Sequence, residues 1–242
     1  MVRAISFDLW FTLIWEKHPE DEELYTDLRV SSIQNVLRSR GYEVPKELIL
    51  RVYRSLGHSR MVLSVRELAS IISTALGFRD KELVEEIARA YETSTDNFTP
   101  RLNEEAAEVL PKLKKVGLKV AIVSNTSFTA RGIRKLLNNV GIGEYVDYVL
   151  SSSDVGLTKP QRAIFLKLLE QLGYEGSEVV HVGDSCVDDV LGALSSGLRA
   201  IYYVGLLKLR KAEADRVCSR LVPTLKSLQD LPKVLNILPA GD

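Results

Sequence analysis

Acidic residues follow two apolar segments of the sequence at the points where those segments end. Asp8 closes the first apolar run of the chain, and Asp184, Asp188 and Asp189 come directly after a later run. A carboxylate at the end of a buried strand costs free energy unless a cation or hydrogen bonds compensate for it. Mg2+ is held by one or two carboxylates together with water and substrate oxygens, and a carboxylate beside such an ion can act as a covalent nucleophile. The acids therefore indicate metal-assisted chemistry, although loop amides could equally satisfy Asp8, and Asp189 could simply cap a helix.

Two further polar groups occupy comparable places in the sequence. Ser124-Asn125 stands where another apolar run stops, and Lys159 lies between Thr158 and Pro160, just before a helical segment. A hydroxyl and an amide at a strand end can hold an anionic oxygen, and a fixed lysine can neutralise facing carboxylates. Each feature alone has an ordinary alternative, because Ser and Asn also form caps and turns and most lysines are solvated.

The chain after Pro100 alternates between apolar strands and amphipathic helices, which is typical of a parallel sheet covered on both faces. The expected strands are 2–9, 118–124, 145–150, 178–182 and 199–204, with a weak one at 215–218. The expected helices are 104–116, 130–140, 162–172, 189–196 and 225–237. Ligands bind beyond the carboxyl ends of the strands in such sheets, so we expect Asp8, Ser124, Lys159 and Asp184 to meet at one edge.

The segment before this alternation has a different character. Its apolar residues recur at helical spacings, and Gly41, Gly57 and Gly77 punctuate it as glycines do at helix ends. We therefore predict an α/β core formed by residues 1–15 and 99–242, with a helical unit of about four helices inserted at 16–98.

Composition limits the classes of protein to consider. The chain has 242 residues, of which 45% are hydrophobic, and 32 basic residues balance 32 acidic ones. No overall field attracts nucleic acid or a membrane surface, and no apolar stretch is long enough to span a bilayer. The two cysteines, Cys186 and Cys218, lie in no metal-binding spacing and are expected to be reduced thiols. The cytoplasm is the expected location.

The chain resembles the haloacid dehalogenase (HAD) superfamily over nearly its whole length. The resemblance rests on four motifs, each following a strand in the family's order: Asp8, Ser124-Asn125, Lys159-Pro160 and Gly183-Asp184. The sequence of segment 101–124 also resembles that of the family, and the helical insert resembles the family's C1-type cap. This resemblance implies a Rossmann-like core with a helical cap that closes over a small-molecule site.

The resemblance also implies a role for each matching residue. Asp8 would be the nucleophile that forms an aspartyl ester or aspartyl phosphate, Thr12 would support its loop, and Lys159 would hold Asp8 and the transferred group. Ser124 and Asn125 would bind that group. Mg2+ would be held by Asp8, the backbone carbonyl of Trp10, Asp184 and Asp189.

Trp10 departs from the pattern of the family's phosphatases, which carry an acid at this position to protonate the leaving oxygen. The dehalogenase branch has a non-acidic residue there, because halide leaves without a proton, but that branch needs no metal and lacks the Gly-Asp cluster. The preferred interpretation is therefore a Mg2+-dependent phosphohydrolase that acts on a small phosphorylated molecule. Without the acid, it should favour substrates with good leaving groups. The alternatives are a metal-independent 2-haloacid dehalogenase and a non-catalytic phosphate-binding regulatory protein.

Residues near the entry to the insert could replace the missing acid, and we consider Glu16, His18 and Glu20. A dehalogenase would need a cap arginine for its halide, for which the sequence offers Arg29, Arg38, Arg40, Arg51 and Arg54. Neither the physiological substrate nor the choice between a monomer and a homodimer follows from the sequence.

Overall fold

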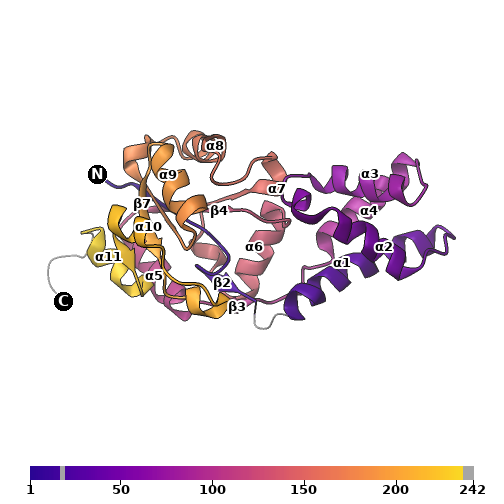
Figure 1. Ribbon diagram of the computed structural model, residues 1–242, viewed down its shortest axis with the longest axis horizontal. Coiled ribbons are helices and arrows are strands. Elements are labelled where there is room, and N and C mark those ends of the chain that lie inside the picture. Colours follow the sequence, from indigo (N-terminus) through magenta and orange to yellow (C-terminus); the bar gives the residue numbers. More distant parts are fainter. Residues whose placement is uncertain (17–19, 237–242) are drawn as a thin grey trace.

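A six-stranded parallel sheet organises the larger part of the molecule in the computed structural model, which describes residues 1–16 and 20–236 (Figure 1). Its strand order is β5-β4-β1-β6-β7-β8. The bounds are β1 Ala4–Phe7, β4 Lys119–Ser124, β5 Tyr148–Ser151, β6 Val179–Gly183, β7 Arg199–Tyr203 and β8 Thr224–Leu225. Phe7 pairs with Ile122 of β4 and with Val182 of β6, so the chain leaves these three strands at the same edge.

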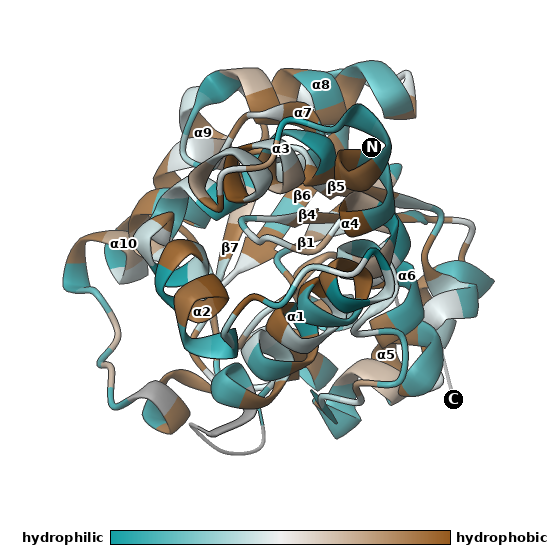
Figure 2. Ribbon diagram, turned by 90° about the vertical axis from the view of Figure 1, so that its right-hand side faces the viewer, coloured by the Kyte–Doolittle hydropathy of each residue, from teal (hydrophilic) through white to brown (hydrophobic). Residues whose placement is uncertain are grey.

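Helices cover both faces of this sheet. On one face lie α5 (Glu104–Lys115) and α6 (Ala130–Asn139), and on the other lie α8 (Arg162–Leu172) and α9 (Gly192–Ser195). Ile5 and Phe7 of β1 belong to the apolar cluster that includes α5 and α6, whereas Ala4 belongs to the cluster with α8 and α9. Figure 2 shows the strands in the interior, between α8 and α9 on one side and α5 and α6 on the other. The predicted α/β fold class is confirmed.

A second group of helices lies beside the sheet unit (Figure 1). It consists of α1 (Glu20–Ser39), α2 (Lys46–Ser55), the 3-10 turn η1 (Gly57–Met61), α3 (Val65–Ala75) and α4 (Lys81–Thr93). Capping residues explain where two of these helices begin. Ser64 and Glu67 form a capping box before α3, and Asp80 accepts from the amide of Glu82 before α4. These helices share a hydrophobic cluster of their own.

Two short strands connect the helical unit to the sheet unit. β2 (Ile14–Trp15) precedes the helices, β3 (Arg101–Leu102) follows them, and the two pair in antiparallel fashion. The chain thus enters and leaves the helical unit at one place, as an insertion requires, while the boundaries at 16 and 98 stay a prediction. Within the described ranges, no helix combines the length and the hydropathy that crossing a membrane requires.

The C-terminal part corrects two sequence expectations. Residues 215–218 are not a strand, because the Asp215 carboxylate accepts from the amides of Val217 and Cys218 and so starts α10 (Arg216–Leu221). The helix expected at 225–237 begins instead with β8, which pairs with β7 and is followed by the short turns η6 (Leu228–Asp230) and α11 (Leu231–Val234). Ile237 lies outside the described residues.

The remaining elements are short and lie in the connections of the core. They are η2 (Gly143–Tyr145), α7 (Ser152–Val155), η3 (Gly176–Glu178), the π-type turn η4 (Cys186–Leu191) and η5 (Leu207–Arg210). The expected helix at 189–196 is therefore divided between η4 and α9.

Cys186 and Cys218 are joined by a disulfide, so the expectation of two reduced thiols is wrong for this structure. The bond joins η4, which follows the acidic cluster, to α10 across a sequence separation of 32 residues. Nothing in the linear spacing indicates this pairing, because it depends on how α10 packs against η4.

Reduction of this disulfide is expected to lower the free energy of unfolding by about 2–4 kcal/mol, because the bond limits the unfolded chain over a loop of this length. Denaturant unfolding with and without a phosphine reductant measures the difference. The Cys186→Ser/Cys218→Ser variant is the control and should not respond to the reductant. Identical unfolding curves for the native protein in both conditions would contradict the prediction.

Candidate active site

Lys159 and two of the predicted acids meet at the carboxyl edge of the sheet. The Lys159 ammonium nitrogen lies 2.6 Å from Oδ1 of Asp8 and 2.6 Å from Oδ1 of Asp189. Asp8 follows β1, Lys159 precedes α8, and Asp189 lies in η4 after β6. Carboxylate oxygens of Asp8, Asp184 and Asp189 all lie within 4.8 Å of one another, and all three residues are buried. The predicted convergence of these residues is present.

Burial and charge together set the protonation of this group. Burial raises the pKa of Asp8 to about 6, although Lys159 works against that rise. Burial would also raise the pKa of Asp189, but Lys159 and His181 outweigh it and hold that pKa well below its ordinary value. The pKa of Lys159 is raised, because its two carboxylate partners outweigh burial, which would lower it. Lys159 is thus a permanent buried cation that favours the ionised form of Asp8.

The buried ring of His181 contacts the carboxylate of Asp189. Its Nδ1 lies 2.9 Å from the Ser6 hydroxyl and its Nε2 lies 3.2 Å from Oδ1 of Asp189. Burial lowers the pKa of His181, so the neutral ring accepts from Ser6 and donates to Asp189. A lone histidine in an apolar strand gives no sign in the sequence that its ring orients an acid of the site.

Gly183 allows the acidic cluster to fold back on its own strand. A Cβ at this position would lie 2.3 Å from the Asp189 carboxyl carbon, so a larger residue would push that carboxyl away. Oδ2 of Asp189 accepts from the backbone amide of Ser185 at 2.8 Å. The lack of a side chain at Gly183 therefore lets Asp189 lie against Lys159.

Asn125 fixes the backbone of Lys159. Its side-chain amide donates to the Lys159 carbonyl at 2.8 Å, and its oxygen accepts from the Lys159 amide, also at 2.8 Å. These two bonds engage Oδ1 and one of the two N–H groups of the amide, and Asn125 also lines the cavity of the site. Asn125 thus positions the lysine, and its predicted contact with the transferred group stays a prediction.

Two buried hydroxyls of the predicted site have no protein partner among the described residues. Oγ of Ser124, at the end of β4, and Oγ1 of Thr12 form no hydrogen bond there. Both side chains are fully buried. Leaving a buried hydroxyl unsatisfied costs about 1–3 kcal/mol, so the Ser124 hydroxyl is suited to donate to a bound oxygen. Thr12 contributes to the loop through its carbonyl, which accepts from Asn103 at 2.9 Å.

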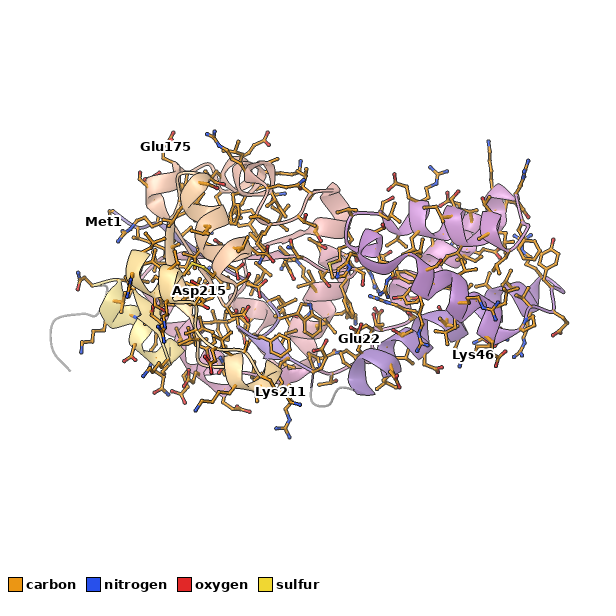
Figure 3. All side chains as sticks on the ribbon, in the orientation of Figure 1. Met1, Glu22, Lys46, Glu175, Lys211 and Asp215 are labelled. Atoms are coloured by element: carbon orange, nitrogen blue, oxygen red, sulfur yellow. A yellow bond between two sulfur atoms is a disulfide. The ribbon has the colours of Figure 1, made fainter. Side chains whose placement is uncertain are left out.

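A cavity of about 440 Å³ opens over this group. The sheet unit contributes Asp8, Trp10, Lys159 and Asp184, and the helical unit contributes Glu22, Tyr25, Arg60 and Met61. Figure 3 shows Glu22 at the end of α1 that lies toward the sheet unit. The cavity therefore lies between the two units, where closure of one on the other would exclude water from the reacting groups.

Trp10 lines this cavity where an acid would be needed to protonate a leaving oxygen. Its ring centroid lies 5.8 Å from that of Phe128. The next residue, Phe11, has a φ of +58°, a left-handed conformation that costs a bulky residue free energy. Glu16, one of the suggested substitute acids, also lines the cavity, whereas His18 and the side chain of Glu20 lie outside the described part of the chain.

The suggested halide-binding arginines do not enter the cavity. Arg29 of α1 is buried and donates to the hydroxyls of Tyr53 and Ser127, while Arg40 is paired with Glu86. Among the described residues, the arginine that lines the cavity is Arg60 of η1. The sequence gave no signal for it, because a surface-like residue in an irregular turn has no periodicity to mark it.

The donor set fits a hard divalent cation. Three buried carboxylates converge, and Lys159 offsets part of their charge. Oxygen ligands from carboxylates are those that Mg2+ prefers. Both oxygens of Asp189 already accept hydrogen bonds, which leaves Asp8 and Asp184 as the acids best suited to bind a cation.

Comparisons with known proteins find similar proteins over nearly the whole chain. The model of the haloacid dehalogenase-like hydrolase family matches residues 2–197. The mouse haloacid dehalogenase-like hydrolase domain-containing protein 3 is 27% identical over 247 residues, covering 100% of this chain and 94% of the mouse protein. The glyceraldehyde 3-phosphate phosphatase of Methanothermobacter thermautotrophicus is 26% identical and covers 90% of this chain and 91% of its own length. The crystal structure of a 2-haloacid dehalogenase from Pseudomonas syringae shares the fold, with a TM-score of 0.65 and 23% identity over 98% of this chain and 99% of that one.

Proposed function

Because the chain belongs to the haloacid dehalogenase-like hydrolase family, we propose that it is a phosphohydrolase that acts on a small phosphorylated molecule through Asp8. The observation that supports this choice most is the meeting of three buried carboxylates, two of which pair with Lys159. Such a group carries excess negative charge, which a divalent cation would offset and which halide displacement would not need. The archaeal relative that covers most of the chain is by its name a phosphatase.

We propose that Asp8, Asp184 and the backbone carbonyl of Trp10 would hold Mg2+. When bound, Mg2+ would supply positive charge to the phosphoryl oxygens and to the acids themselves. The family pattern suggests Asp189 as a further ligand, but its hydrogen bonds favour a role in holding Lys159. Mg2+ titration of the native protein and of Asp184→Asn would test the ligand set.

The reaction divides into two steps on this chain. An oxygen of Asp8 forms a bond to phosphorus, and the bond from phosphorus to the leaving oxygen breaks with its electron pair on that oxygen. Lys159 neutralises Asp8 and the phosphoryl group, and the Ser124 hydroxyl donates to a phosphoryl oxygen. Water then cleaves the aspartyl phosphate, which releases inorganic phosphate and restores Asp8.

The helical unit acts as a cap in this proposal. It contributes one wall of the cavity, so its closure would keep bulk water from the phosphoryl group and would admit substrates by shape and charge. A screen of phosphate esters for phosphate release, with Mg2+ and with EDTA, tests the function. Release from no ester in Mg2+ would refute it.

Replacement of Trp10 by aspartate is expected to raise turnover of a sugar phosphate by up to roughly 10²-fold, because the new carboxyl can protonate a basic leaving oxygen. Turnover of p-nitrophenyl phosphate should change little, since its leaving group departs as a weak base. Initial rates of phosphate release with Mg2+ measure both substrates.

Trp10→Asn is the matched control for that experiment, because it removes the same ring without adding an acid. It should resemble the native enzyme on both substrates after correction for any loss of folded protein. Equal turnover of the two substrates by the native enzyme would show that another residue protonates the leaving oxygen.

A 2-haloacid dehalogenase is the second candidate, and Trp10 is the observation that favours it. Chloride release from 2-chloropropionate in EDTA, compared with phosphate release in Mg2+, separates the two. A non-catalytic phosphate-binding protein would show neither activity but would still bind beryllofluoride with Mg2+.

A further inference from the structure

Aromatic side chains line the cavity that opens over Asp8. Trp10 and Phe11 come two and three residues after Asp8, and both line the cavity. Phe128, in the segment between β4 and α6, and Tyr25 of α1 line it as well. The ring centroid of Phe128 lies 5.8 Å from that of Trp10 and 5.5 Å from that of Tyr25. The sheet unit and the helical unit therefore both contribute rings, and two of these rings lie close in sequence to the proposed nucleophile.

Phe11 has a backbone conformation that its side chain disfavours. Its φ is +58°, in the left-handed region, where a bulky side chain is strained and glycine is not. The surrounding turn fixes this conformation, because the Phe11 amide donates to the carbonyl of Ile14 at 2.7 Å. Glycine would form the same turn without strain, so the turn does not account for a phenylalanine at this position. Strained residues gather at active sites and at loops that contact ligands.

Trp10 limits the leaving groups that the site can release. Its indole N–H is not acidic enough to protonate a leaving oxygen, so the bond to phosphorus breaks most readily when that oxygen departs as a weak base. Phenolates, enolates and carboxylates meet this requirement, whereas the alkoxides of sugars and alcohols do not. Of the three, a phenolate carries an aromatic ring directly on the leaving oxygen. That ring would lie beside the phosphoryl group, within reach of residues that follow Asp8.

Charged side chains also line the cavity, and they define the rival expectation. Glu16, Glu22 and Arg60 belong to this set. If they governed recognition, the leaving part of the substrate would carry a charge. Two of them act on Tyr25, because burial raises the pKa of its hydroxyl and Glu16 and Glu22 raise it further. Tyr25 therefore stays neutral and presents an uncharged ring to the cavity.

We propose that Phe11 stacks on an aromatic ring of the leaving group, so that the substrates are small aryl phosphate esters. This assignment rests on the proposed phosphohydrolase with Asp8 as its nucleophile. It joins two separate observations, a strained ring in the cavity beside the nucleophile and a residue at position 10 that cannot protonate the leaving oxygen. Aromatic pairs gain affinity beyond the apolar area that they bury. Phe11 determines specificity and takes no part in the transfer itself.

The test compares phosphonates, which cannot be hydrolysed, by calorimetry with the full-length protein in Mg2+. Benzylphosphonate mimics phenyl phosphate, cyclohexylmethylphosphonate has a similar size without a flat ring, and methylphosphonate reports the phosphoryl end alone. Two charged compounds, 2-aminoethylphosphonate and phosphonoacetate, represent the rival expectation. The native protein should bind benzylphosphonate most tightly of the five.

Phe11→Leu keeps an apolar side chain but removes the ring. We expect it to lower the affinity for benzylphosphonate by roughly 3- to 10-fold and to leave the affinity for methylphosphonate unchanged. The KM of phenyl phosphate should rise by a similar factor. Its kcat should hold, because the same ring contact is present before and during bond cleavage.

Phe11→Gly separates a role in binding from a role in the fold. Removal of the left-handed strain should leave the melting temperature equal to or above that of the native protein, while the affinity for benzylphosphonate falls further than in Phe11→Leu. Phe78→Leu is the matched control, because Phe78 packs on Tyr42 with the ring centroids 4.5 Å apart and does not line the cavity. It should bind all five phosphonates as the native protein does.

The outcomes separate this inference from the proposed function. Tight benzylphosphonate binding that depends on Phe11, without hydrolysis of any phosphate ester, would support the stacking contact and refute the phosphohydrolase. Hydrolysis with benzylphosphonate affinity unchanged in both Phe11 variants would overturn the role of Phe11 and leave the phosphohydrolase standing. A native protein that binds cyclohexylmethylphosphonate or a charged phosphonate as tightly as benzylphosphonate would also overturn it, as would failure of all five to bind.

Discussion

Asp8→Asn is expected to lower the rate of phosphate release by at least about 10⁴-fold, because the amide cannot form the bond to phosphorus on which both steps depend. The substitution changes the size of the side chain little and removes one of three buried negative charges. Binding of a phosphonate or of inorganic phosphate should therefore persist or become tighter, since less negative charge faces the anion. Steady-state rates with Mg2+, together with calorimetric titration of the phosphonate, measure the two effects.

The tight binding expected of this variant distinguishes loss of the nucleophile from loss of the fold. Asp188→Asn is a matched control, because Asp188 also lines the cavity but is not assigned a bond to substrate. It should retain most of the activity. An Asp8→Asn protein that kept a tenth of the native rate would exclude covalent catalysis by Asp8.

The convergence of Asp8, Lys159 and the later acids was predictable because it follows from topology alone. Parallel strands place their carboxyl ends at one edge, so polar residues that follow successive strands meet there whatever the intervening sequence. The register of β1 with β4 and β6 bears this out. The four helices of the insert were also predictable, since their apolar residues recur at helical spacing and capping residues precede α3 and α4.

The features that the sequence did not reveal depend on contacts between distant segments. His181 orients Asp189 only because β6 and η4 lie together, and Asn125 clamps Lys159 across 34 positions of sequence. Arg60 is relevant because η1 reaches the cavity, which no local pattern encodes. The disulfide has the same origin, since it depends on how α10 packs against η4. The segment at 215–218 differs, because the Asp215 cap that starts α10 is a local signal.

Lys159→Met is expected to reduce kcat/KM by about 10²–10³-fold, because the phosphoryl group loses the fixed cation beside it. It should also lower the free energy of unfolding by about 3–5 kcal/mol, since two buried carboxylates would lose their shared partner. Lys159 favours the ionised form of Asp8, so its loss should raise the pKa of Asp8. Asp8 attacks as the carboxylate, so activity rises with pH through that pKa, and the acidic limb of the rate profile should move to higher pH.

The double variant Lys159→Met/Asp189→Asn separates the structural part of that loss from the chemical part. Removal of one of the two stranded carboxylates should restore much of the stability, because Asp189 and Lys159 are direct partners at 2.6 Å. The rate should stay low, since Asp8 and the phosphoryl group still lack their cation. Denaturant unfolding and a pH–rate profile at saturating Mg2+ measure both quantities. Recovery of activity along with stability would mean that Lys159 serves only to hold the fold, and its contact with Asp8 would then have no part in the reaction.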